Sequence, residues 1–359
     1  MIQLKAFKQP VAQWNEHLRK HEGSMFLSHE WLEALKSEAG QPLYFLFSDQ
    51  DNIKAMIAGL ERPVGNGKRR QLFFFAGIAS AGNDPHLLKQ CKLLLLGYAR
   101  NNSYWRVIMK SYDCMRCHNA KIKDYVAFQR KEFIIDLTRE LQEISQAISP
   151  EARRKIRRAD REGLVFKQGY SEELLKALFQ LIDSTYQIRT RKGYGKYSPY
   201  SMPFLNQEIA MHLLKQKRAI IHYIEKGGKP LSMAFTVIVA QKAYGIWMGS
   251  SPEGYKAAAP SLLIFESIKA LKANGNTYLN MGGVPLGSKN QGVRKFKLSM
   301  GATPVDSVEQ TTDFLMPPLS YLNHVMKLKR VVEQLRMPWK AKKILLQGFG
   351  LILKDHDKY

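Results

Sequence analysis

Residues 219–281, AIIHYIEKGGKPLSMAFTVIVAQKAYGIWMGSSPEGYKAAAPSLLIFESIKALKANGNTYLNM, decide the fold. Apolar runs typical of β-strands occur here four times, at 219–225, 230–240, 242–249 and 277–281. The first two flank Lys226-Gly-Gly-Lys and predict a β-hairpin. A longer apolar segment at about 260–273 predicts a helix before the last strand. Hairpin, strand, helix and strand in this order predict a mixed α/β sheet.

The first third of the chain repeats this order. Its strand-like runs are 42–48, 53–61, 71–76 and 105–110. The first two flank Asp49-Gln-Asp-Asn, a second hairpin turn, and a helix is expected to precede them at 28–37. Asp84 followed by Pro85 suits the N-terminus of a helix that extends to about residue 101. Two similar α/β units are therefore expected, although their sequences are too different to call a repeat.

Residues 141–161, between the two halves, are polar and strongly helical. An apolar stripe at i, i+4 spacing predicts one continuous helix and consists of Ile144, Ile148, Ala152 and Ile156. The other sides carry six cations: Arg153, Arg154, Lys155, Arg157, Arg158 and Arg161. This face is either simply solvated or binds phosphate beside a groove, and in the second case Arg154 and Arg157 are the candidate ligands.

The composition allows two domains and favours an anionic partner. A chain of 359 residues with 45% hydrophobic residues is too long for one typical core and too apolar to be disordered. The net charge of +24 attracts RNA, acidic lipid headgroups or diphosphate-linked substrates. A basic RNA- or membrane-binding module without catalysis is one interpretation. The sequence has no apolar run of 18 residues and no signal-peptide pattern at its start, so a cytoplasmic protein is expected.

The three cysteines do not predict a metal or haem site. Cys114-Met-Arg-Cys117-His118 matches the haem-attachment pattern, but that modification needs an exported chain. A structural zinc ion requires four ligands, of which this cluster offers three, and Cys91 would have to supply the fourth. A redox dithiol remains a further interpretation.

Three segments carry a family pattern over about 136–305. In chain order they are Phe133-Ile-Ile-Asp-Leu137 with the basic helix Ala152-Arg-Arg-Lys-Ile-Arg-Arg-Ala-Asp-Arg-Glu-Gly163, then Ala257-Ala-Ala-Pro-Ser-Leu-Leu263 leading into 268–275, and finally Asn280-Met-Gly-Gly-Val284 with Gly292, Phe296-Lys297 and Gly301-Ala302. Together they resemble the Fem family of non-ribosomal peptidyl transferases and its acyltransferase relatives. The first half resembles the family in architecture only.

The resemblance implies an α/β (α+β) protein with two tandem acetyltransferase-like (GNAT) domains, whose mixed sheets are flanked by helices. The first would comprise 1–137 joined by 306–359, and the second 138–305. It also implies an enzyme that moves an aminoacyl group from aminoacyl-tRNA to an amine of a phosphorylated or lipid-linked cell-envelope precursor. An acyl-coenzyme A-dependent N-acyltransferase of the same fold, acting in envelope or exopolysaccharide pathways, is the alternative. The coiled-coil arm of many family members is missing, because Gly163 leads directly into 164–167.

The resemblance assigns candidate residues to this chemistry. Lys297 is the candidate catalytic cation for the developing oxyanion, and Tyr255 is a candidate general acid. Donor-binding candidates are Phe296, Gly282, Gly283 and Arg294. No G-x-S-x-G motif and no Cys/His pair is evident, which favours direct attack by the amine without a covalent enzyme intermediate. No tightly bound cofactor is expected.

Residues 186–200 are predicted to form a loop that binds the acceptor or a phosphate. Cationic and aromatic side chains alternate in it, and Arg189 and Tyr200 are the candidates, unless the loop is merely exposed. Coenzyme A users place an R/Q-x-x-G-x-G/A loop, whose N–H groups hold the pyrophosphate, at the position of 256–261. That stretch here, Lys-Ala-Ala-Ala-Pro-Ser, has no glycine and contains a proline, which argues against coenzyme A.

The C-terminal segment 315–354 is amphipathic and basic. It contains eight Lys and Arg residues against one acid, Glu333, and the nearly apolar stretch 344–353. Ten residues of helix reach about 15 Å, so the stretch is too short to span a bilayer. Either the segment lies in a membrane interface, with the enzyme at the inner face, or it packs on the first domain as ordinary core.

Overall fold

The computed structural model describes residues 1–36, 40–64, 69–114, 128–193, 200, 202–285, 291–309, 312–317, 319–334, 341 and 344–348. The chain forms two compact units. The first consists of Met1–Gln129 and Ser307–Tyr359, and the second of Arg130–Asp306. Cys114 is disulfide-bonded, whereas Cys117 and His118 lie outside the described residues. Among the described residues, no helix is long and apolar enough to cross a membrane and no acid, His or Cys cluster could hold a metal.

The first unit has a sheet ordered β1-β2-β3-β4-β6-β14, with β5 paired to β3. Its strands are β1 (Gln3–Phe7), β2 (Gln41–Asp49), β3 (Asn52–Val64), β4 (Arg69–Phe74), β5 (Ala79–Ser80), β6 (Arg106–Met109) and β14 (Thr312–Leu315). Its helices are α1 (Trp14–Lys20), α2 (His29–Ala34), α3 (Pro85–Asn101) and α11 (Leu322–Gln334). The predicted hairpin joins β2 to β3, and the Asp84 carboxylate accepts a hydrogen bond from the N–H of His86 at 2.9 Å at the start of α3.

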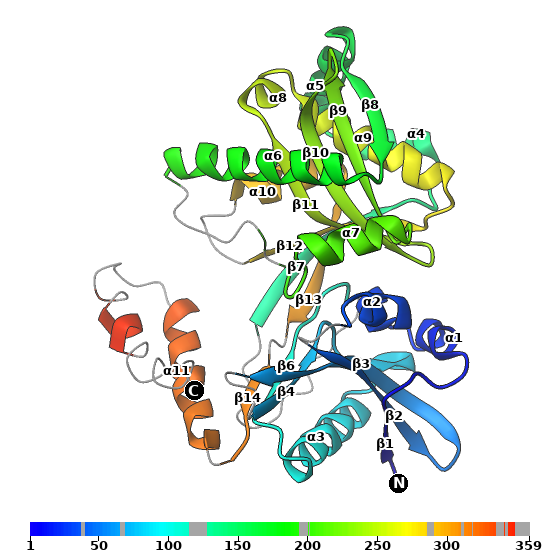
Figure 1. The fold of residues 1–359 in the computed structure, drawn as a ribbon, viewed down its shortest axis with the longest axis vertical. Coiled ribbons are helices and arrows are strands. Elements are labelled where there is room, and N and C mark those ends of the chain that lie inside the picture. Colours follow the sequence, from blue (N-terminus) through cyan, green and yellow to red (C-terminus); the bar gives the residue numbers. More distant parts are fainter. Residues whose placement is uncertain are drawn as a thin grey trace. The chain divides into compact units, whose positions relative to one another are not determined.

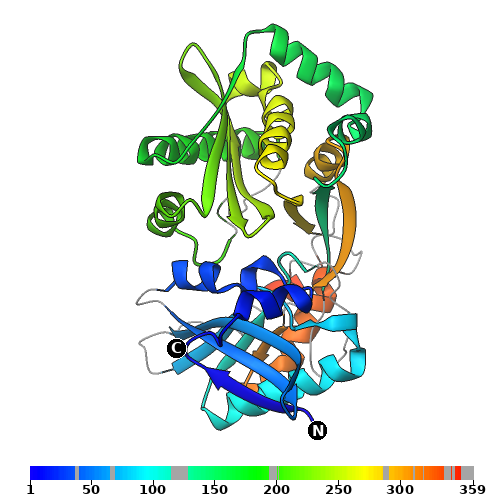
Figure 2. The same cartoon turned by 90° about the vertical axis from the view of Figure 1, so that its right-hand side faces the viewer.

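The second unit has a sheet ordered β13-β7-β12-β11-β10-β9-β8. Its strands are β7 (Phe128–Asp136), β8 (Val165–Gly169), β9 (Ala219–Lys226), β10 (Lys229–Val239), β11 (Lys242–Ser250), β12 (Tyr278–Pro285) and β13 (Thr303–Glu309). Its helices are α4 (Leu141–Ala147), α5 (Pro150–Arg161), α6 (Glu172–Arg191), α7 (Gln207–Lys215), α8 (Pro252–Lys256), α9 (Ala259–Ala273) and α10 (Gln291–Ser299). Helices α6 and α9 cover opposite faces of this sheet (Figures 1 and 2).

The two units repeat one arrangement of elements. In each, a hairpin and a third strand are followed by a helix and a strand parallel to the third: β4 pairs with β6, and β11 with β12. The first unit was expected to extend to residue 137, but its first segment ends at Gln129. Because β7 pairs with β12, residues 130–136 extend the second sheet and not the first.

The prediction of one helix over 141–161 was wrong, because two helices, α4 and α5, occupy this range. The chain is extended at Ile148, and Ser149 precedes Pro150, which disfavours helical backbone at that serine. The Ser149 hydroxyl instead caps α5 by accepting a hydrogen bond from the N–H of Ala152 at 3.2 Å. The four predicted stripe residues are nevertheless all buried in the core of the second unit.

His222 is an unusual member of this core. It lies on β9, is fully buried, and neither of its ring nitrogens has a hydrogen-bond partner among the described residues. The ring packs against Phe166 with 5.5 Å between centroids. Burial disfavours the imidazolium form and lowers the pKa of His222 from 6.5 to about 4.

The buried His222 should make stability depend on pH. Because the unfolded chain takes up a proton near pH 6.5 and the folded chain only near pH 4, stability is lost as the pH falls between these values. We expect the free energy of unfolding to fall by about 2 kcal/mol from pH 7 to pH 5 through this residue. Urea denaturation at both pH values should show a smaller difference for His222→Leu. His86→Leu, on the exposed start of α3, should keep the wild-type difference, and equal differences in all three proteins would contradict the prediction.

Candidate functional site

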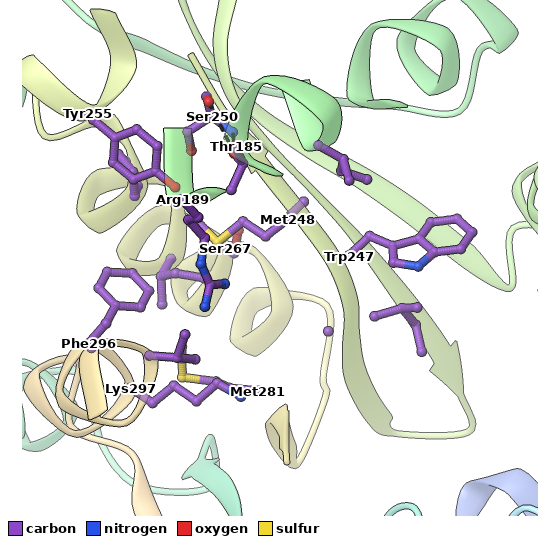
Figure 3. A pocket seen from close by; sticks show the side chains of 18 of the residues that line it. Thr185, Arg189, Trp247, Met248, Ser250, Tyr255, Ser267, Met281, Phe296 and Lys297 are labelled. Atoms are coloured by element: carbon purple, nitrogen blue, oxygen red, sulfur yellow. Dashed lines mark hydrogen bonds between the residues drawn. The ribbon is translucent and has the colours of Figure 1, made fainter. Parts of the chain in front are cut away.

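A pocket of about 530 Å³ lies in the second unit where β11 and β12 separate. The two strands are paired in parallel only from Lys242 with Tyr278 to Tyr244 with Asn280. Beyond that point both strands contribute to the pocket wall, together with α6 on one side and α9 on the other (Figure 3). The sheet therefore opens where the parallel pairing of β11 and β12 ends, and a substrate can enter between the two strand ends.

Close packing fixes α6 on β11. At Gly249, a Cβ atom would lie 2.4 Å from the backbone nitrogen of Ile182, so the helix backbone rests directly on the strand. The Thr185 hydroxyl accepts a hydrogen bond from the N–H of Ser250 at 2.8 Å and donates one to the Ser250 carbonyl at 3.1 Å. These contacts fix the face of α6 that lines the pocket, which carries Ile182, Thr185, Ile188 and Arg189.

Arg189 is one of these residues, and its environment corrects the sequence-based prediction. Helix α6 continues to Arg191, so residues 186–191 are helical and not part of a loop, while 194–199 lie outside the described residues. The apolar positions Leu175, Leu178 and Ile182 bury one face and hold the helix in place. Figure 3 shows Arg189 extending into the pocket with its guanidinium group toward Phe296 and Met281.

Lys297 also lines the pocket, on α10, next to Phe296. Its side chain is 8% exposed, and its Nζ donates a hydrogen bond to the Gly282 carbonyl at 2.9 Å. The ammonium group also lies 5.5 Å from the centre of the Phe133 ring, a favourable cation–π distance. A water-poor location of this kind is where a cation stabilises an oxyanion most strongly.

Tyr255 lines the pocket from α8, with 46% of its surface exposed. Its hydroxyl points toward the side of the pocket from which Arg189 extends (Figure 3). The strand–helix connection is held by Gly254, where a Cβ atom would lie 2.3 Å from the Leu231 carbonyl oxygen. A phenol at the mouth of the pocket suits a general acid that protonates a leaving group.

Other predicted site residues do not line the pocket. Arg154, Arg157 and Arg294 are exposed on α5 and α10, and Gly283 pairs with β7. Tyr200 donates a hydrogen bond to Asp183 at 3.0 Å and packs against Phe179 and Trp247. Burial and the neighbouring carboxylate raise the pKa of Tyr200 to about 12. Tyr200 therefore supports the aromatic core behind the pocket.

The N-terminus of α9 offers few N–H groups to a ligand. Ala257, Ala258 and Ala259 are all buried, and Ala258 has a left-handed conformation, with φ of 59°. The N–H groups of Ala257 and Ala258 donate to the carbonyl oxygens of Glu253 and Tyr255. Because Pro260 has no N–H group, few donors remain for a pyrophosphate at this helix end.

Two buried polar residues near the pocket were not found from the sequence. Ser267, on α9, is 3% exposed, lines the pocket, and its hydroxyl has no partner among the described residues. A serine within the apolar stripe formed by Ile264, Ile268 and Leu271 was the available signal. Glu132, on β7, is 1% exposed, and nothing in its local sequence indicates burial.

A protein-family comparison matches the unit that contains the pocket. Residues 150–298 match the family model described as "Acetyltransferase (GNAT) domain". The second unit is a GNAT acyltransferase domain. No curated protein sequence matches the chain.

Solved structures extend the similarity to almost nine-tenths of the chain. FemX is 13% identical with a TM-score of 0.61, over 89% of this chain and 98% of that one. L-PGS from Bacillus licheniformis is 20% identical with a TM-score of 0.50, over 89% and 97%. A conserved protein of unknown function from Bacteroides thetaiotaomicron is 13% identical with a TM-score of 0.53, over 88% and 100%. At these identities the similarity establishes the fold, and the predicted Fem-like fold with two mixed sheets is confirmed.

Proposed function

We propose that this protein transfers an aminoacyl group from aminoacyl-tRNA to an amine of a cell-envelope precursor, inside the pocket between β11 and β12. The observation that carries the proposal is a cationic pocket in a GNAT domain: Arg189, Lys192 and Lys297 line it, and none of its described lining residues is acidic. The amine attacks the ester carbonyl carbon, and Lys297 stabilises the resulting oxyanion. The C–N bond forms and the ester C–O bond breaks. Tyr255 is the available donor of the proton that the leaving oxygen receives, and its phenolate takes up the proton that the amine nitrogen loses.

Two features support a large polyanionic donor over coenzyme A. The N-terminus of α9 offers few N–H groups to a pyrophosphate, whereas Arg189 and Lys192 approach the pocket from α6. The net charge of +24 also favours tRNA, because its phosphates are distributed over a wide surface. An acyl-coenzyme A donor remains the second candidate, since the GNAT match itself favours it.

The donor proposal predicts a salt-sensitive interaction. We expect aminoacyl-tRNA to bind more tightly than acetyl-coenzyme A, and its affinity to fall about 50-fold from 50 to 200 mM salt if about four phosphates are contacted. Arg189→Ala should reduce the salt dependence, whereas Lys176→Ala, at the far end of α6, should not. Calorimetry at several salt concentrations measures both effects. Tight coenzyme A binding together with salt-insensitive or absent tRNA binding would reverse the order of the two candidates.

We also propose that the C-terminal segment brings the enzyme to the inner face of the membrane, beside a lipid-linked acceptor. The support is a group of exposed apolar side chains in the described part of 315–354: Leu328, Val331, Ile344 and Leu345 are between 43% and 68% exposed. Apolar side chains of this kind insert shallowly into a membrane interface, while each nearby lysine adds about 1 kcal/mol on anionic lipid.

Flotation with anionic vesicles tests this placement. At low salt, we expect the full-length protein to float with the vesicles, while a chain ending at Pro338 stays in solution. A full-length Ile344→Asp, Leu345→Asp variant should behave like the truncated chain, and its circular dichroism should remain that of the wild type. If the wild-type protein stays in solution, the segment packs as ordinary core and the acceptor need not be on a membrane.

A further inference from the structure

A buried carboxylate outside the pocket is connected to Lys297 by successive hydrogen bonds. Glu132, on β7, accepts a hydrogen bond from the side-chain amide of Asn280 at 2.8 Å. The Asn280 side-chain oxygen accepts one from the N–H of Gly282 at 2.8 Å. The Gly282 carbonyl then accepts the bond from Lys297 Nζ. The series therefore runs from β7 through β12 to the pocket wall.

Glu132 also joins the two strands that form the pocket. Its second carboxylate oxygen accepts a hydrogen bond from the Tyr244 hydroxyl at 2.8 Å. Tyr244 and Asn280 are the last parallel pair before β11 and β12 separate, and all three residues are at most 3% exposed. A buried carboxylate costs several kcal/mol unless its oxygens are hydrogen-bonded. Here both are satisfied, at the point where the pocket begins.

The backbone at Gly282 makes the connection possible. The register between β12 and β7 shifts between Asn280 and Gly283, so that Gly282 lies in a bulge with φ of 76°. A bulge removes a residue from the regular ladder and leaves its N–H group without a strand partner. The Asn280 side chain supplies the missing acceptor, and the Gly282 carbonyl is left to bind Lys297.

We propose that Glu132 is a positioning residue for Lys297. By holding Asn280, it fixes the Gly282 bulge, and the bulge carbonyl holds the ammonium group at the pocket wall. Its negative charge, inside the same network, offsets the positive charge of the buried lysine. The consequence for catalysis rests on the role given to Lys297 under the proposed function, whereas the positioning itself does not.

Chemical labelling tests the positioning without using activity. In Glu132→Gln, the new amide group no longer offers Asn280 and Tyr244 two acceptor oxygens, and Lys297 should be held less firmly. We expect the rate at which N-hydroxysuccinimidyl acetate modifies Lys297, followed by peptide mass spectrometry, to rise about tenfold. The rate at the exposed Lys295 should not change. Glu225→Gln, which alters a carboxylate bound to Lys167 elsewhere in the same sheet, should leave Lys297 at the wild-type rate.

Kinetics test whether Glu132 acts through Lys297. We expect Glu132→Gln to lower kcat about tenfold with little change in KM, and to have no further effect in a Lys297→Ala background. Losses that multiply, or an unchanged labelling rate, would overturn the proposal. If Lys297 is labelled faster in Glu132→Gln but kcat is unaffected in Lys297→Ala, Glu132 positions the lysine and the lysine has no catalytic role. If Glu132→Gln does not fold, Asn280→Ala, which keeps the carboxylate, takes its place with the same expectations.

Discussion

Replacing Lys297 with alanine is expected to lower kcat about 100-fold and to leave the protein folded. The loss corresponds to one group that stabilises the oxyanion in the transition state. The side chain is suited to this role because it lines the pocket, is 8% exposed and is held by the Gly282 carbonyl at 2.9 Å. Steady-state kinetics, with whichever donor calorimetry shows to bind, measures kcat. Thermal unfolding of the wild type and of Lys297→Ala shows whether the variant is folded.

Lys295→Ala is the matched control for this substitution. Lys295 lies on the same helix, α10, but is exposed and does not line the pocket. Its replacement should change kcat by less than about twofold, as expected for a surface lysine. Equal, small effects of both substitutions would show that Lys297 has no part in the chemistry.

Gly249→Ala should strongly destabilise the second unit. The added Cβ would lie 2.4 Å from the nitrogen of Ile182 and 2.5 Å from the carbonyl carbon of Leu181, both in the backbone of α6. Because backbone atoms cannot rotate away, α6 must move from β11 and take Thr185 and Arg189 with it. We expect the free energy of unfolding to fall by about 3 kcal/mol and the activity to be lost.

Gly97→Ala is the control, because we expect it to raise the free energy of unfolding. Gly97 lies within α3, and a Cβ atom there would meet no atom within 4 Å. Alanine should therefore raise stability by about 0.5–1 kcal/mol, through the lower backbone entropy of the unfolded chain. Urea denaturation of the two variants measures both changes. A Gly249→Ala protein with wild-type stability would mean that α6 is not fixed by this close contact.

Local sequence determined the elements and their order. The turns at Lys226-Gly-Gly-Lys and Asp49-Gln-Asp-Asn specify hairpins because their residues tolerate turn backbone, and Asp84 starts α3 because its carboxylate caps the helix. Each signal acts between residues a few positions apart. For the same reason, the repeated order of hairpin, strand, helix and strand was sufficient to predict two similar units. The candidates Phe296 and Lys297, which the family resemblance supplied, line the pocket.

Tertiary structure alone decided which side chains meet in the pocket. Arg189 lies there because Gly249 lets α6 approach β11. This contact joins Gly249 to Ile182, 67 positions earlier in the chain, and no local pattern encodes it. Glu132 and Asn280 are 148 positions apart and are joined only because β7 pairs with β12. A charged residue in a strand is normally predicted to be exposed. Only the hydrogen bonds that the folded chain supplies make its burial stable, because they replace the water that the carboxylate loses.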